Sequence, residues 1–295
     1  MRMSARRRYL RHHVPELLML PALLVMAVVM GFPLVYLLFM SLHKWSMIGF
    51  APPSFVGLGN FVALLDDERF TGSLVRTAAF TALGLASNLP AGFAIALLLN
   101  QPFPTRNLLR ALLIFPMVAT PVAMGLVWVV MLDPTLGVVR YLFALVGVVD
   151  PPLWLSDSAW VVPTLVAVDA WMWTPMVALI CIAGLAALPP EPFEAAFVDG
   201  ASAWQRFRYL TFPLMLPTLT VAAMLRVMDL LKVIDIVFVM TGGGPGYASE
   251  TINLYNYLVA LSYDKIGYGA AVALVLFALV LLCTLGLVRL RRPAW

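Results

Sequence analysis

The chain has 295 residues and a net charge of +4, and 62% of its residues are hydrophobic while only 12% are charged. Charged residues make up about a quarter of a soluble globular domain, so this composition excludes that class. The mean hydropathy of +0.94 indicates a protein embedded in lipid. The apolar runs match the ~20 residues that a helix needs to cross a bilayer, and not the alternating pattern of barrel strands. The predicted fold class is therefore all-α integral membrane.

Six apolar stretches predict six transmembrane helices. They cover approximately residues 17–42, 74–99, 108–132, 161–188, 211–240 and 268–288. No linker between them is long enough to separate two domains, so we expect residues 1–295 to form a single transmembrane domain. An even number of spans also places both ends of the chain on one side of the membrane.

The positions of the basic residues predict that this side is cytoplasmic. The inferred inside face carries Arg2, Arg6, Arg7, Arg8, Arg11, Arg106, Arg110, Arg206, Arg208, Arg289, Arg291 and Arg292. The inferred outside loops carry Lys44, Arg69, Arg76, Arg140 and Lys265. Membrane topology explains this charge better than nucleic-acid binding does. The apolar run that begins at Leu17 is too long for a cleavable signal peptide and shows no cleavage site.

Prolines interrupt nearly every predicted span. They are Pro21, Pro33, Pro90, Pro116, Pro121, Pro163, Pro175, Pro213 and Pro217. Each removes a backbone donor, which is tolerated where a helix is packed against protein or lines a cavity. This pattern favours a transport protein over a simple anchor, although membrane helices contain more proline than soluble ones in any case.

Charged residues recur every three positions in the fifth predicted span, at Arg226, Asp229, Lys232 and Asp235. Burying them unpaired in lipid would cost several kcal/mol each. They either face a water-filled pathway and touch a polar substrate, or form a self-neutralising series that holds helices together. Lys232 and Asp235 lie nearer the outer end, and we expect them to be the structural pair.

The fourth predicted span places Asp169, Met172, Trp173 and Met176 on one helical face. A carboxylate beside an indole suits a sugar, because hydroxyl groups donate to the carboxylate while the apolar face of the ring packs on the aromatic side chain. The alternative is that the Met/Trp stripe is ordinary helix packing.

Catalytic and metal-binding motifs find no support in the sequence. Residues 241–246 read TGGGPG, but no Lys-Ser/Thr follows as a P-loop requires, so we interpret this segment as a flexible breaker that ends the fifth span. No other segment resembles a nucleotide-binding loop, and ATP would have to bind to another chain. Cys181 and Cys283 lie in separate apolar segments, which predicts small core residues and not a disulfide or a metal site.

A polar stretch between two apolar spans carries a recognisable motif. From Glu194 to Pro213 the chain reads EAAFVDGASAWQRFRYLTFP. This resembles the cytoplasmic "EAA" loop of bacterial ABC importer permeases. The matching positions are Glu194, Ala195, Ala196, Gly200, Leu210, Phe212 and Pro213. The run Asp199-Gly200-Ala201, together with the later Asp235 and TGGGP, is similar to the carbohydrate branch, in particular to the maltose-type first permease subunit. The similarity extends from Leu17 to Arg289.

The resemblance implies a six-helix type I importer permease in the bacterial cytoplasmic (inner) membrane. Its implied partners are a second homologous permease, two ATP-binding cassette subunits that hold ATP and magnesium, and an extracytoplasmic substrate-binding protein. This chain itself would need no cofactor. Residues 190–208 would form the coupling loop seated on an ATPase. The implied contacts to the ATPase are Glu194, Ala195, Ala196, Asp199 and Gly200, with Phe193, Phe197 and Trp204 as candidate apolar anchors.

The resemblance also implies a cargo site at mid-membrane. Aligned from Glu194, the sugar-contacting positions of the maltose-type relatives match Asp169, Met172, Trp173, Met176, Arg226, Asp229, Leu230 and Val233. The residue types differ from those of the maltose-type relative, so the cargo need not be maltose. Because Arg226 is suited to a phosphate or a carboxylate, a cargo like glycerol 3-phosphate stays open.

The sequence leaves two other classes of function open. An ion-coupled secondary transporter would use Asp169, Asp229 and Asp235 as a proton relay. A membrane-embedded enzyme or a non-transporting scaffold is the third class.

Overall fold

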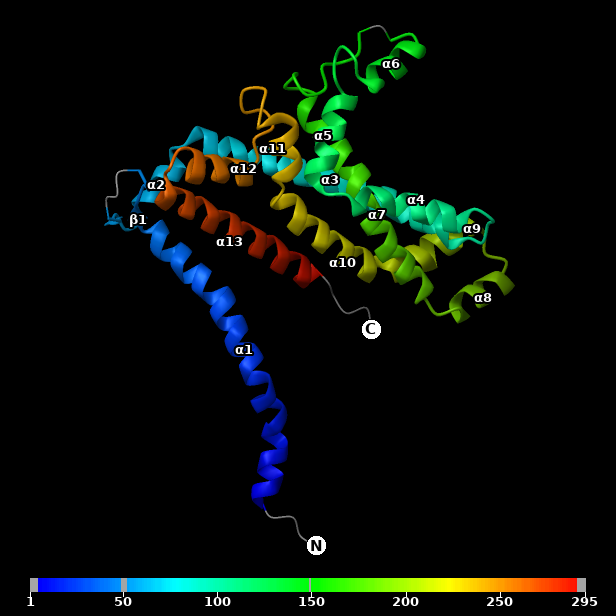
Figure 1. Cartoon of the computed structure of the whole chain (residues 1–295). Helices are drawn as coiled ribbons and strands as arrows, with labels where there is room; N and C mark the ends of the chain where they lie inside the picture. Colours follow the sequence, from blue (N-terminus) through cyan, green and yellow to red (C-terminus); the bar gives the residue numbers. More distant parts are fainter. Residues whose placement is uncertain (1–4, 49–51, 149, 291–295) are drawn as a thin grey trace. The chain divides into compact units, whose positions relative to one another are not determined.

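The computed structural model describes residues 5–48, 52–148 and 150–290 (Figure 1). The described residues are mainly helical, with two very short strands. By its internal contacts the chain divides into two compact units, Met1–Asp66 with Leu258–Val275, and Asp67–Tyr257 with Leu276–Trp295. The topology prediction also used Arg2, Arg291 and Arg292, which lie outside the described residues.

The first unit holds the N-terminal span and the segment that starts the last span. Its elements are α1 (Ala5–Ser41), β1 (His43–Lys44), β2 (Ser54–Phe55), α2 (Gly59–Leu65), the π-helical turn η2 (Leu258–Ser262) and the beginning of α13 (Ile266–Leu290). The two strands form a small antiparallel hairpin in which His43 pairs with Phe55. Asn60 donates from Nδ2 to the Ser41 and His43 carbonyl oxygens, at 2.7 and 3.0 Å, and so fixes the end of α1.

Asp264 ties the 46–48 segment to the start of the last span within this unit. Its carboxylate accepts from the Ser46 hydroxyl and from the backbone N–H groups of Met47 and Ile48, the latter two at 2.9 and 2.8 Å. These bonds, led by the one from Ser46, lower the pKa of Asp264 below its ordinary value of 3.8. Asp264 therefore holds this corner as a charged carboxylate.

The second unit holds the remaining elements. They are α3 (Glu68–Asn100), α4 (Arg106–Val118), α5 (Pro121–Met131), α6 (Val138–Leu145), α7 (Val161–Ala186), α8 (Glu191–Val198), α9 (Ala203–Arg206), the π-helical turn η1 (Phe207–Thr211), α10 (Phe212–Leu231), α11 (Asp235–Thr241), α12 (Ile252–Tyr257) and the end of α13. Figure 1 shows α3, α7 and α10 lying side by side, and α3 makes its most extensive contacts with α7.

Close approach of these three helices depends on glycines at their crossings. A Cβ at Gly84 of α3 would lie 2.6 Å from the Leu230 side chain of α10, and one at Gly184 of α7 would lie 2.6 Å from Thr218 of α10. Small residues at such crossings are typical of membrane bundles, where van der Waals contact drives association. The buried cluster formed by the three helices consists of Phe93, Ala96, Val177, Cys181, Leu185, Met215 and Ala222.

Four of the six predicted spans agree with apolar helices of spanning length. These helices are Leu18–Ser41, Glu68–Asn100, Val161–Ala186 and Ile266–Arg289. The prediction for the cysteines was right for Cys181, which is buried, and wrong for Cys283, which is exposed on α13. Both thiols are free.

The predicted third span, 108–132, is not one straight helix. It consists of α4 and α5, which meet at an angle of 98° across a break of two residues. Pro121 begins α5, and Thr120 before it has an extended backbone with φ −66° and ψ 140°. This is the conformation that a following proline favours, because its ring clashes with a helical preceding residue.

The predicted fifth span, 211–240, is also broken. Its apolar helix ends at Leu231, and α11 begins only at Asp235. The row of four charges therefore does not lie on one helix. The expected pairing of Lys232 with Asp235 was wrong: within the described part of the chain the ion pairs of this region are Arg226 with Asp169 and Arg226 with Asp229.

Candidate functional site

A buried ion pair joins α7 to α10 in the middle of the second unit. Arg226 Nη2 of α10 lies 2.5 Å from Asp169 Oδ2 of α7, and the two side chains are 1% and 4% exposed. Asn88 of α3 donates from Nδ2 to the same Asp169 oxygen at 3.2 Å and accepts at Oδ1 from the Thr174 hydroxyl at 3.2 Å. The carboxylate thus has charged and neutral partners from two other helices, as a buried charge requires.

Asn88 is a site residue that the sequence analysis missed. It is fully buried in α3 and also donates to the Gly84 carbonyl at 2.7 Å. Its only signal in the sequence is that it is an amide within an apolar span, and polar residues in such spans often join helices.

A cavity of about 260 Å³ opens beside this pair. It is lined by Pro121, Asp169, Trp173, Arg226, Asp229, Lys232, Val233, Ile234, Asp235 and Ile236. Pro121 starts α5 after the first helix break, and residues 232–234 are the second break. The cavity therefore lies where two spans are interrupted, as binding sites between discontinuous helices do in other transporters.

Five of the eight predicted cargo positions line this cavity and three do not. Asp169, Trp173, Arg226, Asp229 and Val233 are on its wall. Met172 is 1% exposed and buried in the core, as is Leu230, which fills the space above Gly84. Met176, which is half-buried, is also absent from the cavity wall. Of this face of α7, Met172 therefore packs inside the bundle, whereas Asp169 and Trp173 line the cavity.

The charges of the cavity largely neutralise Arg226. Its Nη1 lies 4.0 Å from Asp229 Oδ2, in addition to the closer contact with Asp169. Its Cζ is 5.7 Å from the centre of the Trp173 ring, and its Nε is buried without a hydrogen-bond partner in the described structure. Asp229 is 46% exposed and presents its carboxylate to the cavity. The described residues contain no group of His, Cys, Asp or Glu that could hold a metal ion.

The predicted coupling loop folds as two short helices, α8 and α9. Helix α8 ends in a left-handed turn at Gly200, whose φ is +73°. Ala201 N–H donates to the Ala196 carbonyl at 2.9 Å and Gly200 N–H donates to the Phe197 carbonyl at 3.1 Å. This is the Schellman pattern of helix termination, in which glycine avoids the strain of a Cβ. The spacing between Ala196 and Gly200 in the motif thus has a direct structural reason.

The second short helix, α9, begins with a reciprocal cap. Ser202 Oγ accepts from Gln205 N–H at 3.3 Å, while Gln205 Oε1 accepts from Ser202 N–H at 2.7 Å. The exposed fractions of Phe197 and Trp204 are 72% and 68%, although both are large and apolar. Exposed apolar side chains that gather on a polar loop mark a protein–protein contact surface. Phe193, the other candidate anchor, is half-buried and lines an open hollow of about 800 Å³, whose wall Phe197 shares.

The family is decided by comparison with known sequences. Residues 88–293 match the family described as "binding-protein-dependent transport system inner membrane component". The chain belongs to this family. It is an ABC transporter permease of the inner membrane, and so a transport component and not an enzyme. Such a permease works with partner subunits.

Relatives of nearly the same length support this assignment. The trehalose/maltose transport system permease of Thermococcus litoralis is 34% identical over 286 residues, which cover 96% of this chain and 95% of that protein. The sulfoquinovosyl glycerol transport system permease of Agrobacterium fabrum is 31% identical over 276 residues, covering 94% and 89%. These matches give no support to the ion-coupled alternative.

Solved structures show the same fold. A bacterial ABC transporter that imports the acidic polysaccharide alginate contains a chain with a TM-score of 0.80 and 21% identity, covering 98% of this chain and 100% of that one. An alginate transporter in complex with its alginate-bound periplasmic protein gives 0.82 and 20% identity, with 97% and 96% covered. The predicted permease fold is confirmed.

Proposed function

We propose that this permease passes an uncharged sugar or polyol through the cavity between α7, α10 and the two helix breaks. The observation that carries the proposal is the pairing of Arg226 with Asp169, which leaves the exposed Asp229 carboxylate and the Trp173 indole free to contact a cargo. Lys232 and Asp235 are exposed on the same wall. Hydroxyl groups donate well to a carboxylate, and a pyranose face packs on an indole.

Charge argues against an anionic cargo at this site. The cavity wall carries three carboxylates, from Asp169, Asp229 and Asp235, against the cations of Arg226 and Lys232. An incoming phosphate or uronate would have to compete with Asp169 for Arg226 inside the membrane, where separating a buried pair is costly. The relatives alone do not decide this question, because maltose and trehalose are neutral while alginate is acidic.

The size of the cavity favours a small cargo or one unit of a larger one. Its volume of about 260 Å³ is below the ~300–1,000 Å³ of sites that enclose a drug-sized ligand. A single sugar ring is small enough for a cavity of this volume. The second permease would supply contacts to any further sugar unit of the cargo. On this proposal the whole chain, residues 1–295, acts as one permease domain.

The 190–208 loop is the proposed seat of an ATPase subunit. Glu194, Ala195 and Asp199 are exposed around the α8 end, where Phe197 and Trp204 also reach outward. In the proposed assembly two ATP-binding subunits, a second permease and an extracytoplasmic binding protein surround this chain. Closure of the ATPases on ATP would move α8 and α9, and through η1 the helix α10 that carries Arg226.

Transport in proteoliposomes tests the proposal. The chain would be reconstituted with its second permease, its ATPases and its binding protein, and uptake of radiolabelled trehalose and maltose would be compared with that of glycerol 3-phosphate and an alginate oligosaccharide. We expect ATP-dependent uptake of a neutral sugar that a protonophore does not change. The Asp229→Asn variant should lose most of this uptake, whereas Asp150→Asn, at an exposed loop position, should not.

Two results would overturn the proposal. Preferred uptake of an anionic cargo would contradict the neutral-cargo assignment. Normal uptake by Asp229→Asn would remove this cavity from the cargo pathway. Cargo-independent copurification of the two permeases with the two ATPase subunits supports the assembly whichever cargo is carried.

A further inference from the structure

The break between α10 and α11 exposes backbone carbonyls that another segment satisfies. The chain leaves the helix at Lys232 and re-enters one at Asp235. Asn253 Nδ2 donates to the Lys232 carbonyl at 2.6 Å, and the Thr251 hydroxyl donates to the Val233 carbonyl at 3.0 Å. A broken helix leaves its last carbonyls without intrahelical donors, and within a membrane such groups must find partners. Side chains of residues 251 and 253 thus replace the missing helical bonds.

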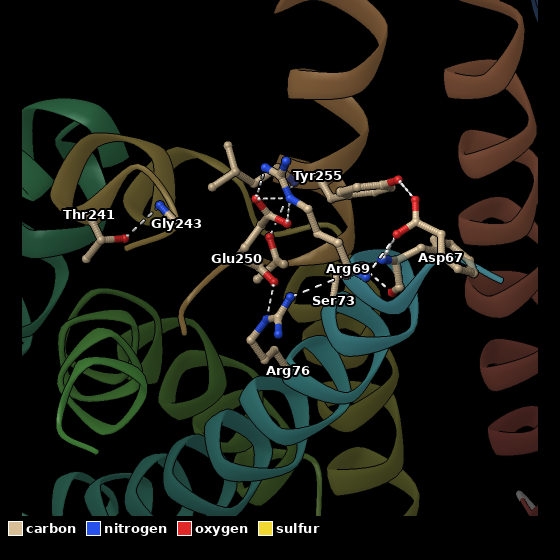
Figure 2. A network of polar contacts seen from close by, with 11 residues as sticks. Asp67, Arg69, Ser73, Arg76, Thr241, Gly243, Glu250 and Tyr255 are labelled. Atoms are coloured by element: carbon tan, nitrogen blue, oxygen red, sulfur yellow. Dashed lines mark hydrogen bonds and ion pairs between the residues drawn. The ribbon is translucent and has the colours of Figure 1, made fainter. Parts of the chain in front are cut away.

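The same short segment is fastened to α3 by a buried glutamate. Glu250 is 1% exposed, and Arg69 contacts its carboxylate from Nε at 2.9 Å and from Nη2 at 2.5 Å. Arg76 Nε donates to the Glu250 carbonyl at 2.9 Å. Figure 2 shows Arg69 and Arg76 reaching from one side of α3 to this residue. A two-point contact between guanidinium and carboxylate fixes both position and orientation.

Two further bonds strengthen this attachment. Ile252 N–H donates to the Thr77 hydroxyl of α3 at 2.8 Å, in a fully buried position. The Tyr255 hydroxyl donates to Asp67 Oδ2 at 2.5 Å, and the other Asp67 oxygen accepts from the first N–H groups of α3. Residues 250–253, which we call the outer clamp, are therefore bonded to α3 on one side and to the cavity wall on the other.

We propose that the outer clamp positions the wall of the cargo cavity. Lys232 and Val233, whose carbonyls it holds, both line that cavity. On the opposite wall, Asn88 of α3 donates a hydrogen bond to Asp169. Helix α3 therefore contacts groups that position both walls of the cavity. Thr251, Asn253 and Glu250 are positioning residues, because they do not line the cavity themselves. This inference rests on the proposed cargo site.

The hydroxyl of Thr251 offers the sharpest test. Thr251→Val keeps the shape of the side chain and removes the bond to Val233, together with the longer contact of 3.5 Å that the hydroxyl accepts from Leu254 N–H. Thr251→Ser keeps the hydroxyl. We expect Thr251→Val to raise the KM for sugar uptake by about fivefold, the size of one hydrogen bond near 1 kcal/mol, with little change in maximal rate. Thr251→Ser should restore the KM. Thr220→Val is the matched control, because the Thr220 hydroxyl donates to the Leu216 carbonyl within α10 itself.

A second measurement is independent of the cargo. Val233→Cys, in a background with Cys181→Ala and Cys283→Ser, reports the position of the cavity wall through its rate of labelling by a small water-soluble thiol reagent. Adding Thr251→Val should raise that rate severalfold, and adding Thr251→Ser or Thr220→Val should not.

The two measurements separate failure of the clamp from failure of the proposed cargo site. Unchanged labelling in Thr251→Val overturns the clamp, whatever the transport result. Changed labelling with an unchanged KM supports the clamp and removes the cavity from the cargo pathway. Equal effects of Thr251→Val and Thr220→Val would also overturn the clamp, since a general loss of stability would then explain both.

Discussion

Arg226 of α10 and Asp169 of α7 form one ion pair at 2.5 Å, although the sequence presents them as members of two separate groups. Both side chains are almost completely buried, and Asn88 of α3 adds a third helix to the contact. A buried pair of this kind is weak support for stability by itself, because removing two charges from water costs nearly as much as their attraction returns. Because both residues line the cavity, we infer that the pair shapes the cargo site.

Removing one partner of this pair should destabilise the permease. Asp169→Leu leaves the Arg226 charge buried with only the more distant Asp229, and breaking a buried pair costs about 3–5 kcal/mol. We expect a lower unfolding temperature and less assembled complex. Combining Asp169→Leu with Arg226→Met removes both charges and should restore assembly, as measured by the yield of copurified ATPase.

The double variant separates a structural role from a functional one. If the pair only joins helices, restored assembly will bring restored uptake. If the pair shapes the cargo site, uptake will stay low in a complex that assembles normally. Full transport by the double variant would therefore show that our assignment of this pair to the cargo site is wrong.

Much of the fold follows from the sequence, because apolar runs of spanning length can be read directly. The exceptions are the two broken spans. Pro116 and Pro121 mark the first break, so the break itself was foreseeable, but a 98° bend depends on which helices the two halves pack against. The second break contains neither proline nor glycine between Lys232 and Ile234. Its carbonyls are satisfied by Thr251 and Asn253, which only the folded chain brings there.

The candidate site was predictable to a similar degree. Helical spacing places Asp169 and Trp173 on one face, and both line the cavity. The same spacing also selects Met172 and Leu230, which are buried in the core, because a helix in a bundle has apolar contacts on nearly every side. The TGGGPG segment was interpreted as a flexible breaker. It does end α11, at Gly242, but the Thr241 and Ser249 hydroxyls then bond the following turn to itself.

The effect of substituting Gly200 should depend on the backbone conformation that the new residue can adopt, and not on the space around it. A Cβ there would meet nothing within 4 Å, but the φ of +73° is strained for most residues, at a cost of about 1–2 kcal/mol. Gly200→Ala should therefore fray the α8 end and weaken ATPase copurification, while Gly200→Asn should do so less. Gly286→Ala, in α13 with open space around it, is the control that should have no such effect. Equal copurification by Gly200→Ala and Gly286→Ala would contradict this account.

Trp204 should contribute to ATPase binding more than an equally exposed aromatic residue elsewhere. It is 68% exposed on α9, next to Phe207 at 5.5 Å between ring centres. Truncating an aromatic anchor at an interface typically costs about 2 kcal/mol or more, so Trp204→Ala should weaken ATPase affinity at least tenfold in a titration of the purified permeases. Tyr141→Ala, 64% exposed on the outer helix α6, should leave that affinity unchanged. Similar losses in both variants would point to a general effect on the fold.

The attachment of residues 46–48 to Asp264 should contribute less to the stability of the fold at acid pH. The pKa of Asp264 is lowered in the folded chain, first by the Ser46 hydroxyl and then by the Ile48 N–H. A lowered folded pKa means that the contribution to stability is complete above the ordinary value of 3.8 and is lost as the pH falls through the folded value. Asp264→Asn removes the titrating charge while keeping the shape.

Thermal unfolding between pH 3 and pH 7 measures this contribution as the difference in Tm between the wild-type protein and Asp264→Asn. We expect a constant difference near neutral pH that shrinks toward zero below about pH 4, because protonation removes the acceptor charge in the wild type only. High salt should reduce the difference, since Asp264 is only half-buried. A difference that stays constant down to pH 3 would mean that Asp264 acts through its shape and hydrogen-bond geometry and not through its charge.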